Sequence, residues 1–312
     1  MKHIFIINPA AGKRNCTAEL MEMAKTLQAR HGIEVECILT TSSGHACQTA
    51  RELAESGESL RFYACGGDGT VNEVANGIAG FPNAAMTCIP VGTGNDFLKN
   101  FGDAAPLFSD AENLWNGPET ALDAIDCNGR LALTIACSGF DAQVAEDVHT
   151  FGKSPLLGSK GSYIASIAVN FLARSLGHRW KVTVDGTDLS GDYAVAAVCN
   201  GRYYGGGFNP TGEARMDDGI LDAVLVKKVS KLQFLQFVGK YERGEAYQLT
   251  RFVRCLPCRE VVIESADGRE IITCLDGETS HSSKVTIRLA EQKVNFFGPV
   301  GCDPNANWRL NR

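Results

Sequence analysis

The residues best suited to chemistry lie in one glycine-rich loop, Gly66-Gly67-Asp68-Gly69-Thr70, which follows an apolar run and opens a predicted helix. Its glycines allow the main chain to approach a ligand closely and to adopt positive φ without a Cβ clash. The amides at the start of the helix favour an anion. A carboxylate repels phosphate, so Asp68 fits the loop if it acts through Mg²⁺ or accepts a proton from a hydroxyl. The loop therefore predicts a phosphate-binding site, with a plain strand–helix turn as the alternative.

A second loop of the same kind, Pro90-Val91-Gly92-Thr93-Gly94-Asn95-Asp96, also lies between a predicted strand and a predicted helix. Taken alone, it is typical of a helix start with Asn95 or Asp96 as the N-cap. Two such loops at the carboxyl ends of parallel strands indicate one ligand site. Neither a Walker A motif nor a dinucleotide fingerprint is present, because Ile7 stands five positions before Gly12-Lys13 and Asn72 stands where a third glycine is required.

The elements that would position both loops alternate between strand and helix along the first hundred residues. Residue patterns predict strands at Ile4–Ile7, Ile33–Leu39, Phe62–Cys65 and Met86–Ile89, and helices at Thr17–Arg30, His45–Glu55 and Thr70–Ile78. This alternation indicates a parallel sheet covered on both faces.

From about Glu119 onward most segments have the pattern of strands, and turn pairs such as Asp185-Gly186 separate several of them. The predicted strands are Leu131–Cys137, Trp180–Val184, Tyr193–Cys199, Ile220–Val226, Val261–Glu264, Ile271–Leu275, Val285–Leu289 and Val294–Phe297, and the predicted helices are Gly161–Leu176 and Lys231–Lys240. We therefore predict an α/β domain over residues 1–120 and an all-β sandwich domain with helical insertions over residues 121–312. The alternative that the C-terminal segment packs back on the first domain stays open.

The composition is that of a globular protein with a substantial core: 312 residues, 44% apolar and 21% charged. The net charge of −6 gives no reason to expect a nucleic acid partner. Twelve cysteines are scattered through apolar runs, which favours reduced, buried thiols. The N-terminal apolar run is too short for a signal peptide, and no apolar run reaches the roughly 18 residues of a membrane span. We therefore expect a cytoplasmic protein.

Several motifs occur in an order that resembles one known family. They are Asn8-Pro9-Ala10-Ala11-Gly12-Lys13, Thr40 or Thr41, Gly66 to Val74, Pro90 to Phe97, Asn200-Gly201 with Gly205-Gly206-Gly207, Asp217-Asp218-Gly219-Ile220-Leu221-Asp222, and Leu275-Asp276-Gly277-Glu278. The chain resembles the diacylglycerol kinase catalytic-domain family, which includes soluble bacterial lipid kinases and the sphingosine and ceramide kinases. The first glycine loop alone would also fit NAD kinases and phosphofructokinases. The resemblance implies a three-layer, NAD kinase-like α/β domain with ATP bound between it and a β-sandwich domain.

The resemblance also implies roles for single residues. ATP would be contacted by Asn8, Pro9, Gly12, Lys13, Thr40 (or Thr41), Gly66, Gly67, Asp68, Gly69, Thr70, Asn72, Glu73, Thr93 and Asn95. The acceptor hydroxyl would be activated by Asp276 or Glu278, with Asp68 assisting. A structural Mg²⁺ would be held by the Asp218 carboxylate, or that of Asp217, with the carbonyls of Arg215 and Ile220.

From the residues alone, plain structural roles remain open for several of these motifs. Asp276-Gly277 is typical of a hairpin turn, and Lys13 of a solvated loop. His45 is expected to cap or pack at a helix start, and Cys255 and Cys258 to flank a turn. The helix predicted at Gly161–Leu176 has the profile of an interfacial helix or of one packed on its own domain.

The leading hypothesis is an ATP- and Mg²⁺-dependent lipid kinase that converts diacylglycerol to phosphatidic acid and reaches its membrane lipid substrate peripherally. The alternatives are a kinase of a soluble metabolite such as NAD and a non-catalytic nucleotide-binding regulator. A homodimer is left open.

Overall fold

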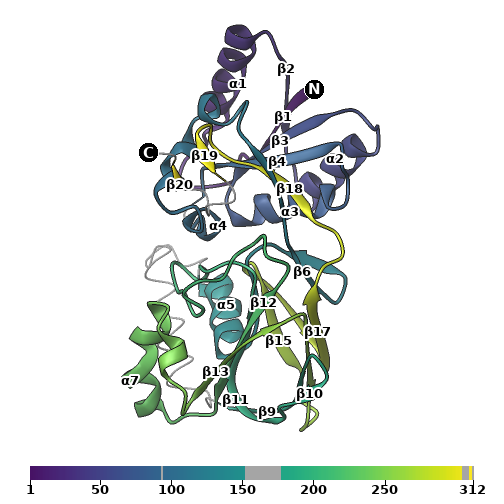
Figure 1. The fold of residues 1–312 in the computed structure, drawn as a ribbon. Helices are drawn as coiled ribbons and strands as arrows, with labels where there is room; N and C mark the ends of the chain where they lie inside the picture. The colour runs from purple at the N-terminus through teal and green to yellow at the C-terminus, as the bar shows by residue number, and fades with distance from the viewer. Residues whose placement is uncertain (93, 152–176, 304–308, 311–312) are drawn as a thin grey trace. The chain divides into compact units, whose positions relative to one another are not determined.

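The computed structural model describes residues 1–92, 94–151, 177–303 and 309–310. The chain forms two compact units, one of Met1–Ala124 with Ala290–Arg312 and the other of Ile125–Leu289 (Figure 1). The predicted helix Gly161–Leu176 and Thr93 lie outside the described residues. None of the described helices is long and apolar enough to cross a membrane.

The first unit is built on a six-stranded sheet with the order β2-β1-β3-β4-β18-β5. Strands β1 (Lys2–Ile7), β2 (Glu34–Leu39), β3 (Leu60–Gly66) and β4 (Ala84–Pro90) are parallel, as predicted. Helix α1 (Thr17–His31) lies on one face of this sheet, and α2 (His45–Ala54) and α3 (Asp68–Ile78) lie on the other (Figure 1). Short helices follow β4, namely α4 (Asp96–Lys99), η1 (Gly102–Ser109) and η2 (Ala111–Asn113).

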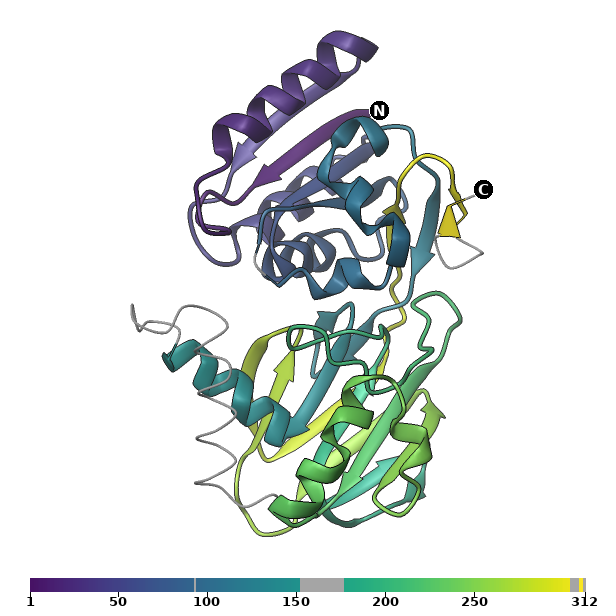
Figure 2. The same ribbon diagram turned by 90° about the vertical axis from the view of Figure 1, so that its left-hand side faces the viewer.

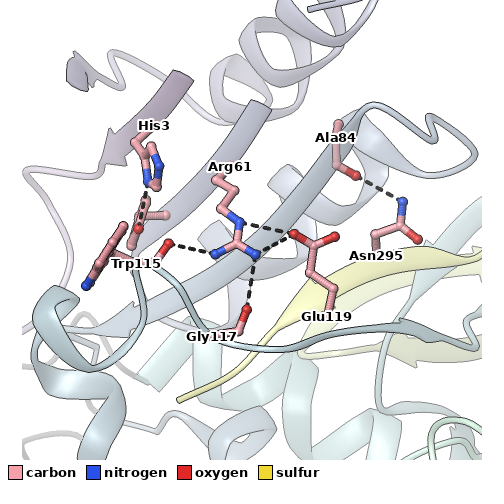
Figure 3. A network of polar contacts seen from close by, with 8 residues as sticks. His3, Arg61, Ala84, Trp115, Gly117, Glu119 and Asn295 are labelled. Atoms are coloured by element: carbon pink, nitrogen blue, oxygen red, sulfur yellow. Dashed lines mark hydrogen bonds and ion pairs between the residues drawn. The ribbon is translucent and has the colours of Figure 1, made fainter. Parts of the chain in front are cut away.

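The C-terminal part of the chain completes this first sheet. Strand β18 (Val294–Phe297) pairs parallel with β4 and antiparallel with β5 (Glu119–Leu122). The Asn295 side chain donates to the carbonyl of Ala84 at 3.2 Å (Figure 3). A further small pair, β19 (Cys302–Asp303) with β20 (Arg309–Leu310), lies beyond. Residues from Ala290 onward therefore belong to the first unit, because the buried face of β18 extends its core.

A buried arginine ties β3 to the segment that leads into β5. The Arg61 guanidinium donates to the carbonyls of Trp115 and Gly117 at 2.6 and 3.0 Å and to the Glu119 carboxylate at 2.6 and 3.0 Å (Figure 3). It also lies 4.5 Å from the ring centre of Phe297. Burial of a cation is costly unless it is paired, and here its donors meet acceptors on every side.

The second unit contains one curled antiparallel sheet of twelve strands. Its main path runs β16-β15-β8-β11-β9-β14-β17-β6-β7; off this path, β10 pairs with β9, β12 pairs with β11, and β13 pairs with β12. The strands are β6 (Ile125–Cys127), β7 (Arg130–Ala132), β8 (Ile135–Gly139), β9 (His178–Val184), β10 (Thr187–Asp188), β11 (Gly191–Cys199), β12 (Leu221–Lys227), β13 (Val253–Cys258), β14 (Glu260–Ser265), β15 (Ile271–Leu275), β16 (Glu278–Ser282) and β17 (Lys284–Leu289). One apolar cluster lies within the curl, as in the predicted β-sandwich.

Helices cover a second apolar cluster on the other face of this sheet (Figure 2). They are α5 (Phe140–Phe151), α7 (Lys231–Glu242) and the short η3 (Ala246–Gln248). The predicted helix Lys231–Lys240 is confirmed as α7, which begins with a capping box formed by Ser230 and Gln233.

Helix α5 was not predicted, and two further local predictions for this unit are wrong. The strand predicted over Leu131–Cys137 is split into β7 and β8 by a bend at Leu133 and Thr134, whose main chain is bound by side chains from elsewhere. The turn predicted between Cys255 and Cys258 is part of β13, because pairing with β12 keeps the chain extended. Pro257 is tolerated there since β13 pairs with β12 alone. All twelve cysteines are free thiols, as expected.

Candidate active site

Three loops of the first unit meet at the carboxyl ends of β1, β3 and β4. The amide of Asn8 donates to the carbonyl of Cys65 at 3.0 Å, and the amides of Val91 and Gly92 both donate to the carbonyl of Gly66 at 3.0 and 3.2 Å. Thr40 joins the same edge, since its amide donates to the last residue of β1 at 2.8 Å. The sheet therefore brings together the loops that the sequence predicted to bind ATP.

Glycines let these loops touch main chain to main chain. A Cβ on Gly12, which has a φ of +80°, would lie 2.1 Å from the carbonyl oxygen of Val91. A Cβ on Gly92 would lie 2.5 Å from the Cα of Gly67. Any side chain at these positions would force the loops apart. Lys13 lies exposed in the same first loop, after Pro9.

Asp68 joins the two glycine loops. Its Oδ1 accepts the amide of Phe97 and its Oδ2 accepts the amide of Asp96, both at 3.1 Å. The predicted cap of α4 by Asn95 or Asp96 is therefore wrong, because Asp68 from the other loop binds the first amides of that helix. Asn95 instead has a left-handed φ of 48° and donates to the carbonyl of Gly92 at 2.9 Å. Burial raises the pKa of the Asp68 carboxyl, while its two amide bonds oppose that shift.

Other predicted nucleotide residues brace the same region. The Asn8 side chain donates to the Thr70 hydroxyl at 3.1 Å and accepts the amide of Ala10 at 3.0 Å. Gly69 is exposed in the first turn of α3, where helical amides have no partner within the helix. The Asn72 side-chain oxygen accepts from Asn76 at 3.0 Å.

Glu73 supports the loop after β2. Its two oxygens accept the amides of Gly44 and Ala46 at 2.8 and 3.1 Å, so it caps α2 from the neighbouring helix. The His45 ring accepts the amide of Thr41 at 3.1 Å, so this histidine, for which a capping or packing role was predicted, binds the loop before α2 and does not cap the helix. Glu73 therefore positions the segment that follows Thr40.

The acidic motif Asp276-Gly277-Glu278 turns between β15 and β16 of the second unit. Both Asp276 and Gly277 have positive φ, 45° and 100°, as a tight hairpin requires. The Asp276 carboxylate accepts three main-chain amides, those of Leu133, Thr134 and Ile135, at 2.6, 3.0 and 3.0 Å. These amides belong to the bend between β7 and β8, so the Asp276 carboxylate links its own hairpin turn to that bend.

Glu278 has a different environment two residues later. Its side chain is 56% exposed, and one oxygen lies 3.7 Å from a guanidinium nitrogen of Arg130. The two carboxylates that the sequence left equivalent are therefore distinct: Asp276 is bound by main-chain amides, whereas Glu278 reaches into solvent.

Asn200 is a positioning residue that the sequence placed in a motif but to which it assigned no role. Its amide and that of Gly201 both donate to the carbonyl of Thr134 at 2.9 Å, and its side chain donates to the carbonyl of Leu133 at 2.7 Å. Asn200 and Asp276 thus bind the two sides of one bend. The Asn-Gly pair was the available signal, but the bend itself was predicted as continuous strand.

The predicted metal loop lies before β12. Asp217 forms an ion pair with Arg215 at 3.1 Å, and Asp218 accepts the amide of Ile220 at 3.1 Å, as in a simple turn. Across the residues that the structure describes, no group of three or more His, Cys, Asp or Glu side chains could hold a metal ion. A structural Mg²⁺ held by Asp218 and carbonyls stays a prediction.

Family models match both units. The model described as diacylglycerol kinase catalytic domain matches residues 2–127, and the model described as YegS C-terminal NAD kinase beta sandwich-like domain matches residues 134–298. A relative from Shewanella frigidimarina named "Probable lipid kinase YegS-like" is 31% identical over 289 residues, which cover 86% of this chain and 90% of that protein. A relative from Bacillus subtilis named "Diacylglycerol kinase" is 28% identical over 77% of this chain and 78% of its own.

A solved structure has the same fold. The crystal structure of a diacylglycerol kinase from Bacillus anthracis superposes with a TM-score of 0.70 at 22% identity, covering 95% of this chain and 96% of that one. The motifs and both family models agree along nearly the whole chain. The protein is a kinase, and it belongs to the lipid kinase family in which a diacylglycerol kinase catalytic domain is followed by a YegS-type C-terminal β domain.

Proposed function

We propose that this kinase transfers the γ-phosphoryl group of ATP to the free hydroxyl of diacylglycerol, producing phosphatidic acid and ADP. The names of the relatives support the choice of lipid. One observation supports the chemistry: the main chain of Gly12 lies against that of Val91, and Gly67 lies against Gly92, with no side chain between them. Because the amides of Val91 and Gly92 already donate to Gly66, the amides suited to bind phosphate oxygens are those of the first turn of α3, which these glycines leave uncovered by side chains.

Glu278 is the general base in this proposal, and Asp276 positions it. A base must reach the hydroxyl proton of the acceptor. The oxygens of Asp276 already accept three amides, whereas Glu278 is exposed at the start of β16. Glu278 takes the proton as the lipid oxygen bonds to the γ-phosphorus, and the bond to the β–γ bridging oxygen breaks to release ADP.

Mg²⁺ bound with the nucleotide would offset the charge of its phosphates. Phosphate and water oxygens usually supply most ligands of such an ion, with one or two carboxylates from the protein. A single carboxylate such as that of Asp68, whose two oxygens each accept one amide and keep a further lone pair, would complete this arrangement. The proposal places the reaction in the cytoplasm, at the membrane surface.

The test is a transfer assay with radiolabelled ATP, Mg²⁺, NAD as a soluble acceptor, and mixed micelles that contain diacylglycerol, sphingosine, ceramide or monoacylglycerol. Label in phosphatidic acid is expected, and Glu278→Gln should remove it while ATP binding persists. Label on NAD alone would indicate a kinase of a soluble metabolite. ATP binding without transfer to any acceptor would indicate a regulator. Label on another lipid would keep the reaction and refute the choice of diacylglycerol.

A further inference from the structure

Helix α7 carries large apolar side chains on the face that it turns away from its own unit. Leu232 and Leu235 are 68% and 59% exposed, and Tyr247 of the following η3 is 62% exposed. On the opposite side of the helix, Phe234 packs edge to face on Phe140 at 5.3 Å and Tyr241 is buried. The exposed leucines therefore contribute little to holding α7 in place.

Basic residues are frequent in the segment that carries these apolar side chains. The segment from Lys227 to Arg254 contains seven Lys and Arg and two Glu, a net charge of +5, whereas the whole chain has a net charge of −6. All seven basic residues are exposed. Of the two acids, Glu245 lies 3.6 Å from Arg243, and Glu242 is exposed. We call Lys231, Leu232, Leu235, Lys240, Arg243, Tyr247 and Arg251 the α7 surface.

We propose that the α7 surface docks the kinase on the headgroup region of an anionic phospholipid bilayer. The inference rests on the proposed function, since a lipid kinase outside the membrane must reach a lipid within it. Leucine and tyrosine side chains amid Lys and Arg are typical of helices that lie in a membrane interface. The basic side chains would meet lipid phosphates while the leucines enter the boundary with the acyl chains.

The charge of this surface favours a bilayer over a second copy of the chain. A symmetric dimer through α7 would place two positively charged surfaces against each other, which is unfavourable. An anionic bilayer instead presents the complementary charge. The surface shares no residue with the segment Gly161–Leu176, for which the sequence left open an interfacial role or packing on its own domain.

The experiment measures binding of the full chain to sedimented vesicles of phosphatidylcholine, with and without phosphatidylglycerol, at low and high salt. The first variant is Leu232→Ser with Leu235→Ser, and the second is Lys231→Glu with Lys240→Glu. The matched control is Met21→Ser, which changes an exposed apolar residue on α1 of the other unit (36% exposed). Circular dichroism and thermal melting establish that each variant is folded.

Wild type should bind the anionic vesicles and release them at high salt. The charge variant should lose affinity by roughly fivefold for each basic residue removed, and the leucine variant by about tenfold. Met21→Ser should bind like wild type. All variants should keep wild-type turnover of a short-chain diacylglycerol that is monomeric in water, because the α7 surface contains none of the site residues.

Equal binding of wild type to both vesicle types, or unchanged binding of both α7 variants, would overturn the proposal. Sedimentation velocity supplies a further outcome, since a wild-type dimer that these variants convert to monomer would assign the surface to self-association instead. Vesicle binding needs no turnover. If wild type binds anionic vesicles but phosphorylates no lipid, the proposed reaction fails while the docking surface stands.

Discussion

Replacing Asp276 by Asn tests whether that residue acts on structure or on chemistry. Asn tolerates the left-handed φ of 45° and nearly matches the shape, so the change removes the negative charge and turns one of the two acceptor oxygens into a donor. The carboxylate accepts three amides at 2.6 to 3.0 Å. Hydrogen bonds to a charged acceptor contribute about 1.5–3 kcal/mol each, and three on one group do not add fully. We expect Asp276→Asn to lower the unfolding free energy of the second unit by about 3 kcal/mol.

The assay is differential scanning calorimetry, which can resolve the melting of the second unit from that of the first. A loss of that size should lower its melting temperature by roughly 6–12 °C, given a unit of this length. Glu278→Gln is the matched comparison, since it neutralises an exposed carboxylate two residues away. Its stability should change by less than about 0.5 kcal/mol, whereas its kcat should fall by about 10²–10⁴-fold with ATP affinity unchanged.

One pattern would refute this assignment of roles. If Asp276→Asn melts like wild type and loses kcat as fully as Glu278→Gln, the three amide bonds are not its function. Asp276 would then act in the chemistry together with Glu278. Loss of ATP binding in Glu278→Gln would exclude Glu278 from that role independently.

Three further predictions concern the first unit. Burial lowers the pKa of His3 to about 4, so the unfolded chain binds a proton at this imidazole more readily than the folded chain does. The free energy of unfolding should therefore fall by up to about 3 kcal/mol as the pH drops from 6.5 to 4. His3→Gln should remove that part of the slope in denaturant titrations across this range, and an unchanged slope would contradict the assignment. Arg61→Met should lower the free energy of unfolding by about 3 kcal/mol, because it leaves buried acceptors without a donor. Glu119→Gln should lower it by less than about 1 kcal/mol, because this side chain is 42% exposed. Equal losses in the two variants, measured by thermal unfolding, would count against the arginine network. Gly92→Ala should weaken ATP binding at least about tenfold in calorimetric titration, because the loops must separate. A Cβ at position 69 would have no atom within 4 Å, so Gly69→Ala should leave the melting temperature unchanged. If Gly92→Ala binds ATP as wild type does, the close approach of the two glycine loops is not required for ATP binding.

Local patterns are reliable where one interaction dominates. The strand–helix alternation of the first unit was predicted because β1, β3 and β4 are buried apolar runs, the half-buried β2 alternates apolar and polar residues, and each helix has one apolar face. The bend at Leu133 and Thr134 could not be predicted in this way. Both residues have strand propensity, and what interrupts the strand is the Asp276 carboxylate, more than 140 positions away, together with Asn200.

The same limit applies to helix caps. Asn95 and Asp96 are suitable caps by residue type, yet Asp68 from another loop binds the amides of α4. Capping needs an acceptor near the first amides, and sequence neighbours are only the most frequent source of one. Glu73 likewise caps α2 from α3.

The sequence by itself determined the class of fold, the glycine loops and the order of motifs that assigns the family, because these depend on local spacing and residue type. Tertiary structure alone decided the place of β18, since a strand's partners depend on which sheet edge its apolar face can cover. It also separated Asp276 from Glu278. Both are acids in one hairpin, and only the fold shows that one carboxylate meets three amides while the other meets solvent.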